Sequence, residues 1–166
     1  VNLLSAQISE FKESFVSGTL KESVYPGDTK IDITYYKLNL RIDIDSGFVD
    51  GITTIDFIFT SDNASSFFLD LSDNLNVDSI KNGNDKLGFI HSDSRIKINL
   101  PEIKMIGETF SVSIFYNGYP SGTGFGSFYI REDKNAMWTL SEPYGAIDWF
   151  PCKDTPADKA DSSDVW

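Results

Sequence analysis

Three side chains in this chain could do chemistry: the carboxylate of Glu142, the thiol of Cys152 and the imidazole of His91. Glu142 follows a strand-like run over residues 136–140 and precedes Pro143. This places Glu142 in a loop at the rim of an expected sheet, where scaffolds present binding groups. On spacing alone, an ordinary solvated glutamate is the better interpretation.

The chain has one histidine and one cysteine, which limits the chemistry it can support. A zinc site needs about three or four His, Cys or carboxylate ligands, so a conventional His/Cys site cannot form. A nucleophilic cysteine usually has a histidine to activate it, and nothing in the sequence places His91 near Cys152. We expect His91 to be structural and Cys152 to be a small packed residue, without a disulfide framework.

The composition is that of a soluble globular domain. The 166 residues are 40% hydrophobic and 14% aromatic, and the net charge is −11. Acidity of this size argues against nucleic acid and anionic membranes as partners, and no apolar run reaches the ~20 residues of a membrane span. The chain begins with Val1, which is compatible with a processed piece of an exported, periplasmic or extracellular protein. The sequence leaves the compartment open.

The first 28 residues differ from the rest of the chain. Ile8, Phe11 and Phe15 fall at helical spacing, and Gly18 is a suitable stop. We expect an N-terminal arm over residues 1–28, either an amphipathic helix or an ordered extended segment. A single folded domain over residues 29–166 should follow.

From residue 36 the hydrophobic period changes to two, which is typical of strands with one buried face. Turn residues separate the runs at short spacing, and this predicts an all-β, antiparallel β-sandwich. A glycine-rich stretch over residues 120–126 lacks the spacing of a phosphate-binding loop and is expected to be a flexible hairpin tip. The expected strands cover residues 36–44, 48–60, 66–71, 75–80, 87–92, 95–100, 109–116, 127–131 and 136–140.

The last thirty residues are dense in aromatics and prolines. Trp149 and Phe150 are expected to be core or domain-interface aromatics. Asp154 begins a turn or caps a helix whose first residue would be Pro156. Lys159 either pairs with a nearby acid or is solvated.

This segment resembles the M1 family of zinc aminopeptidases, the gluzincins that include aminopeptidase N and leukotriene A4 hydrolase. The resemblance spans about residues 29–166, and its sharp motif reads FPCxDxPxxKA. A weaker match is the hairpin over residues 35–57, which resembles the family's opening strands. The matching residues are Trp138, Thr139, Glu142, Gly145, Ala146, Phe150, Pro151, Cys152, Asp154, Thr155, Pro156, Lys159 and Ala160.

The resemblance implies a saddle-shaped β-sandwich that forms the N-terminal domain of a zinc metalloaminopeptidase. The family's GxMEN and HExxH motifs do not occur in these 166 residues. Zinc would therefore be bound by a catalytic domain of the same polypeptide, which this chain lacks. We expect the chain alone to bind no metal and cleave no peptide.

The resemblance also assigns a role to Glu142. In the family, an acid or amide three residues before the position of Gly145 helps to hold the free α-amino group of the peptide substrate. Leu140, Pro143, Tyr144 and Gly145 would adjoin this substrate-binding carboxylate.

The chain departs from the family pattern at two places near this site. Leu140 stands where many members have Gln, and Ile147 where many have Arg. These departures leave the shape of the substrate pocket open.

A different class of function is a non-catalytic β-sandwich that binds protein or carbohydrate, as an adhesion module does. Its binding face would be formed by aromatics near residues 116–119 or 125–129. Fold alone does not decide between the two readings.

Overall fold

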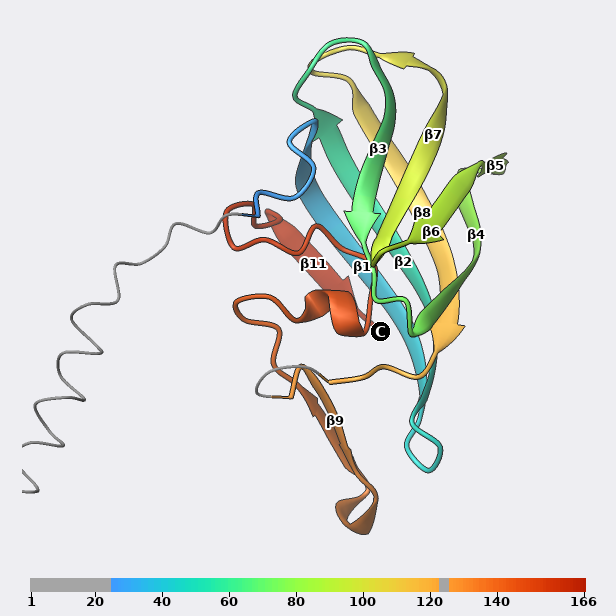
Figure 1. The fold of residues 1–166 in the computed structure, drawn as a ribbon, viewed down its shortest axis with the longest axis vertical. Coiled ribbons are helices and arrows are strands. Elements are labelled where there is room, and N and C mark those ends of the chain that lie inside the picture. Colours follow the sequence, from blue (N-terminus) through green and yellow to red (C-terminus); the bar gives the residue numbers. More distant parts are fainter. Residues whose placement is uncertain (1–24, 123–125) are drawn as a thin grey trace, which may run out of the picture.

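The computed structural model describes residues 25–122 and 126–166, which are built almost entirely from strands (Figure 1). Most of the expected N-terminal arm, residues 1–24, lies outside the described residues. The elements are β1 (Ile31–Asp43), β2 (Phe48–Phe59), β3 (Ala64–Asp70), β4 (Leu75–Asn82), β5 (Asp85–Leu87), β6 (Phe89–Ser92), β7 (Arg95–Lys104), β8 (Thr109–Gly118), β9 (Phe128–Arg131), the 3-10 helix η1 (Glu132–Lys134), β10 (Ala136–Thr139), the 3-10 helix η2 (Ala146–Asp148) and β11 (Ser162–Val165).

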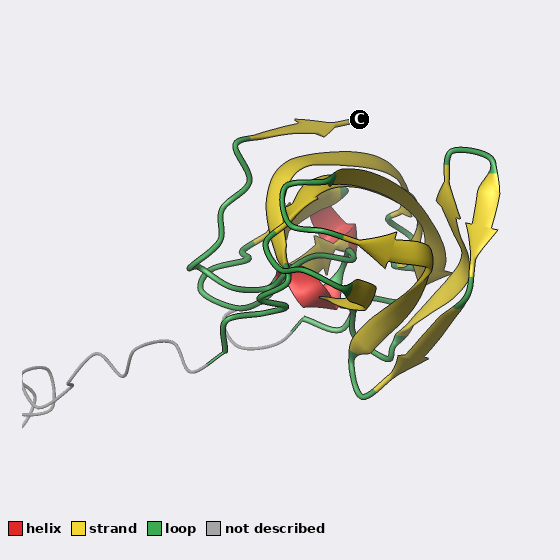
Figure 2. Cartoon of the chain, turned by 90° about the horizontal axis from the view of Figure 1, so that it is seen from above, coloured by secondary structure: helices red, strands yellow, loops and turns green. Residues whose placement is uncertain are grey.

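The strands form a sandwich, which confirms the all-β prediction. A six-stranded sheet has the order β11-β1-β2-β8-β4-β5, and a three-stranded sheet has the order β3-β7-β6. A separate hairpin pairs β10 with β9. Neighbouring strands are antiparallel except for β11, which runs parallel to β1. Seen from above, the strands of the sandwich are strongly curved (Figure 2).

Alternation of apolar and polar residues explains the long strands. In β2, Thr53, Ile55, Phe57 and Phe59 face the core, as their spacing predicted. In β1 the pairing register shifts between Ile33 and Tyr35, so the strand carries one extra residue. This β-bulge keeps Ile31 and Ile33 on the same side as Leu38 although their numbers differ in parity.

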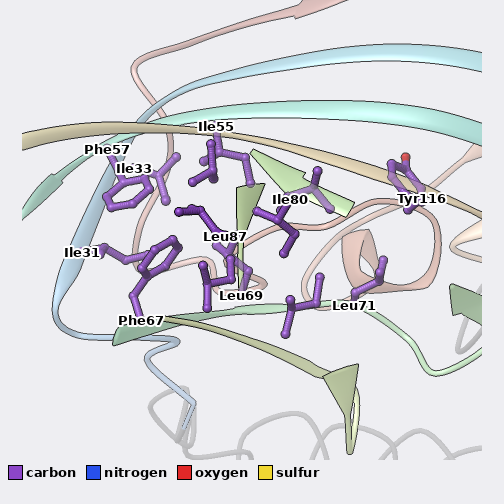
Figure 3. Packing of buried hydrophobic residues seen from close by; sticks show 14 of the residues in the cluster. Ile31, Ile33, Ile55, Phe57, Phe67, Leu69, Leu71, Ile80, Leu87 and Tyr116 are labelled. Carbon is purple, nitrogen blue, oxygen red and sulfur yellow. The ribbon is translucent and has the colours of Figure 1, made fainter. Parts of the chain in front are cut away.

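The core lies between the two sheets, and Figure 3 shows its side chains beneath the large sheet. Phe57 and Phe67 come from opposite sheets, and their ring centroids are 4.8 Å apart. Burial of such aromatic side chains stabilises the sandwich by roughly 1.5–3 kcal/mol each. Tyr116 lies at one end of the core, close to the segment that carries the candidate site (Figure 3).

Several predicted boundaries were wrong. The first strand begins at Ile31, five residues earlier than expected. The run over residues 87–92 is divided at Gly88 between β5 and β6, which belong to different sheets. The stretch over residues 120–126 is not a hairpin tip, because β8 pairs with β2 and β4 while β9 pairs with β10. None of the described helices has the length and apolarity needed to cross a membrane.

Candidate functional site

Glu142 lies in the loop that joins β10 to η2. The β9–β10 hairpin puts Trp138 opposite Tyr129, and their rings stack with centroids 4.4 Å apart. Leu140 extends the pairing by one residue, since its N–H donates to the Ser127 carbonyl at 3.1 Å. The chain then leaves the hairpin, and the Glu142 side chain is exposed.

Both ends of this loop are fixed by packing and hydrogen bonds. The indole N–H of Trp149 donates to the Ser141 hydroxyl at 3.2 Å. A Cβ atom at Gly145 would lie 2.9 Å from the Ser127 Cβ and 3.2 Å from the Leu140 carbonyl oxygen. Only a residue without a side chain fits there, so the buried Gly145 shapes the loop and presents nothing to solvent.

The other predicted site residues gather on one exposed rim. Leu140 is 48% exposed and Tyr144 is 40% exposed. Pro143 is also exposed and is joined to Glu142 by a cis peptide bond. A pocket of about 180 Å³ borders the rim, and Glu142 lines it together with Asp154. The arrangement is a carboxylate surrounded by apolar surface, which can bind a cationic group.

The segment after η2 lies behind this loop and is attached to the small sheet. The N–H of Asp70 donates to the Cys152 carbonyl at 2.7 Å, and the N–H of Cys152 donates back at 3.0 Å. The prediction that Cys152 is a packed residue is confirmed, since it is buried. Burial raises the pKa of its thiol well above the ordinary value, which disfavours the reactive thiolate.

Lys153 forms the ion pair that the sequence offered to Lys159. Its ammonium pairs with Asp158 and donates to the Ile31 carbonyl at 2.7 Å. Lys153 is buried, whereas Lys159 is exposed. The backbone after Asp154 forms a turn, so the alternative of a helix beginning at Pro156 was wrong.

Asp154 is the acid whose environment is most perturbed. Burial raises its pKa from 3.8 to about 6, and the nearby charges of Asp70 and Asp148 act in the same direction. Hydrogen bonds from the backbone N–H groups of Gly145 and Ala146 partly offset this shift. Asp154 is therefore ionised at neutral pH and connects the buried segment to the loop.

The described residues do not fit a zinc ion. Among residues 25–122 and 126–166, no three His, Cys, Asp or Glu side chains are grouped so that they could hold a metal. His91 lies on β6, where its Nε2 is 3.0 Å from the Leu71 carbonyl oxygen. This contact agrees with the structural role expected of His91.

The aromatic face expected for a binding module is wrong in part. Tyr116 is fully buried, and its hydroxyl donates to the Trp149 carbonyl at 3.1 Å. Trp149 is itself buried, as predicted for a core aromatic. Tyr119 and Tyr129 are exposed, whereas Phe125 lies outside the described residues.

Sequence reasoning missed the buried polar residues that support the loop. Asp70 is 2% exposed and Asp148 is 4% exposed, although both are acids. The hydroxyl of Ser127 donates to Asp148. The only local signal was that Asp70 stands between Leu69 and Leu71, an acid inside an apolar run.

Similar folds occur in known metallopeptidases. A two-domain M1 zinc metallopeptidase E323A mutant bound to L-arginine matches with a TM-score of 0.75 at 23% identity, over 84% of this chain and 32% of that one. The M1 zinc metallopeptidase E323A mutant from Deinococcus radiodurans, bound to a Tyr-Ser-Ala substrate, gives 0.74 at 23% identity with the same coverage. Native yeast LTA4 hydrolase gives 0.66 at 18% identity, over 84% of this chain and 24% of that one.

These likenesses establish the fold, and the chain spans only about a quarter to a third of the length of each matched structure. A search of curated proteins gave no significant match. The model of the peptidase M1 N-terminal domain matches residues 33–163, which is most of the chain and includes β1, β2 and the Glu142 loop. The chain therefore belongs to the peptidase M1 N-terminal domain family.

Proposed function

We propose that this domain forms one wall of the active-site cleft of a zinc aminopeptidase, and that Glu142 holds the α-amino group of the peptide substrate. The observation that carries the proposal is the placement of Glu142: an exposed acid in a loop whose two ends are fixed. Family membership supports the peptidase activity of the longer polypeptide. The role of Glu142 is our own inference.

The chemistry of bond cleavage would belong to a catalytic domain in the same polypeptide. The similar structures are described as zinc metallopeptidases, and one of them holds a peptide substrate. The residues described in this chain do not fit zinc, so the catalytic domain would supply the metal ligands. This chain contributes binding and orientation of the substrate.

A fixed carboxylate is a suitable partner for a substrate ammonium. At 4 Å, two opposite charges interact by about 4 kcal/mol in the environment near a protein surface. Hydrogen bonds between an ammonium and a carboxylate are shorter and stronger than neutral ones. Anchoring the amino terminus also sets a constant distance of one residue to the scissile bond, which is the geometry of an exopeptidase.

The residues around Glu142 would set the shape of the first substrate pocket. Leu140 and Tyr144 expose apolar surface beside the carboxylate and would contact the first substrate side chain. Ile147 is half-buried, and its carbonyl accepts a hydrogen bond from the N–H of Ser72 at 2.9 Å. Of the two departures from the family pattern, we therefore expect Leu140 to have the larger effect on substrate choice.

Replacement of Glu142 in the full-length polypeptide tests the proposal. With an amino-acyl anilide substrate, Glu142→Gln should lower kcat/KM by about 10- to 100-fold, since a bond between charged partners is lost. Glu102→Gln is a matched control, because Glu102 is an exposed acid on β7. If Glu142→Gln and Glu102→Gln have the same kcat/KM, Glu142 does not bind the amine.

A further inference from the structure

The carboxylate of Asp154 lies directly behind the loop that carries Glu142. Only 7% of Asp154 is exposed. The backbone N–H groups of Gly145 and Ala146 donate hydrogen bonds to this carboxylate. Because these two residues form the end of the loop, a single buried side chain holds the loop from the inside.

Asp154 is in turn held by the small sheet. Its N–H donates to the Asp70 carboxylate at 3.0 Å, and Asp70 is the last residue of β3. Two backbone hydrogen bonds between Asp70 and Cys152 fix the chain just before Asp154. A continuous set of hydrogen bonds therefore connects β3 to Asp154, and Asp154 to the loop.

A charged residue at this position is costly. The like charges of Asp70 and Asp148 lie close to Asp154, and burial adds to the cost of its ionised form. A neutral acceptor would avoid these costs. What the carboxylate adds is a charge-assisted bond to each of two N–H donors, and such bonds are roughly twice as strong as neutral ones.

We infer that Asp154 is a positioning residue, which sets the place of the Glu142 carboxylate through the backbone of Gly145 and Ala146. This inference rests on the proposed role of Glu142. Asp154 and Glu142 line the same pocket of about 180 Å³, so a shift of the loop end alters the space in which Glu142 meets the substrate. Misplacement of a binding group by about 1 Å can lower a rate by about 100-fold.

A double-mutant cycle in the full-length polypeptide tests this inference. Asp154→Asn keeps the shape of the side chain and should lower kcat/KM for an amino-acyl anilide by about 10-fold or more. If Asp154 acts through Glu142, the variant with both Asp154→Asn and Glu142→Gln should lie within about threefold of Glu142→Gln alone. A residue that only stabilises the fold would give effects that multiply.

Asp28→Asn is the matched control. Asp28 is also buried, at 2% exposure, but its carboxylate accepts hydrogen bonds from the N–H groups of Lys30 and Phe68, away from the loop. This variant should lower the unfolding midpoint while leaving kcat/KM within about twofold of the parent. Should Asp154→Asn not fold, Asp154→Glu displaces the carboxylate by one methylene and should show the same dependence on Glu142.

The possible outcomes separate the two proposals. Multiplying effects, or a fully active Asp154→Asn, would overturn the positioning role while leaving Glu142 in the site. Unchanged kcat/KM in Glu142→Gln would refute the proposed function, and the positioning role with it. Loss of activity in Asp28→Asn equal to that in Asp154→Asn would show that general destabilisation causes both.

Discussion

Substitution of Gly51 by Ala should destabilise the domain by way of Tyr116. Gly51 in β2 pairs with Tyr116 in β8, and the tyrosine ring packs over the glycine. A Cβ atom at Gly51 would lie 2.6–2.7 Å from three atoms of that ring and its hydroxyl, whereas carbon atoms in contact prefer about 3.5–4.0 Å. The ring must therefore move by about 1 Å, although Tyr116 is fully buried.

The magnitude follows from the contacts that this movement disturbs. Overpacking in a core costs about 1–3 kcal/mol. The hydrogen bond from the Tyr116 hydroxyl to the Trp149 carbonyl, 3.1 Å long, contributes about 1 kcal/mol. Replacing a glycine lowers the entropy of the unfolded chain and returns about 0.4–1 kcal/mol. The free energy of unfolding should fall by about 2–3 kcal/mol.

Urea unfolding of the chain measures this change. With a slope of about 1–3 kcal/mol per molar, the midpoint of Gly51→Ala should fall by about 1–2 M while the slope stays constant. Gly88→Ala is the control, because a Cβ at Gly88 meets its nearest neighbour, Asn99, at an ordinary 3.8 Å. If the two variants differ by less than about 0.5 kcal/mol, the close packing of Tyr116 on Gly51 is not as described.

Three further predictions concern the buried segment behind the loop. The raised pKa of Asp154, about 6 against 3.8 when unfolded, means that the folded state binds this proton more tightly, so stability is lost as the pH rises between these values; Asp154→Asn removes the effect, and urea unfolding should show the variant gaining about 1 kcal/mol relative to the parent between pH 5 and pH 8. Lys153→Met leaves Asp158 without its buried partner and should lower the free energy of unfolding by about 3 kcal/mol, whereas equal stability in urea would contradict the buried ion pair. Cys152 should react with a thiol reagent only after unfolding, because it is buried and its pKa is raised; rapid labelling of the folded protein would disagree with its placement.

Local patterns were sufficient to predict the long strands. Residues that alternate in β2 and β8 share a face because side chains of a strand point alternately to its two sides. The bulge in β1 also had a signal, since the apolar positions change from odd at Ile31 and Ile33 to even at Leu38. That change of parity was overlooked, so the strand was begun too late.

Contacts between distant segments could not be predicted in the same way. Gly88 separates two sheets, and the apolar pattern around it carries no information about which sheet each half joins. Asp70 is buried because residues 152–154, more than eighty positions later, cover it. The resemblance identified Asp154 as part of a motif, but its contact with the Glu142 loop depends on this long-range packing.

The most direct test of the central claim is the affinity of the full-length enzyme for a pair of inhibitors that differ only in the α-amino group. The parent should bind the amine-bearing inhibitor about 10- to 100-fold more tightly than its deaminated analogue, because an ammonium pairs with Glu142. In Glu142→Gln this preference should fall to about threefold or less, while the affinity for the deaminated analogue stays constant. An equal preference in both proteins would show that another group holds the substrate amine.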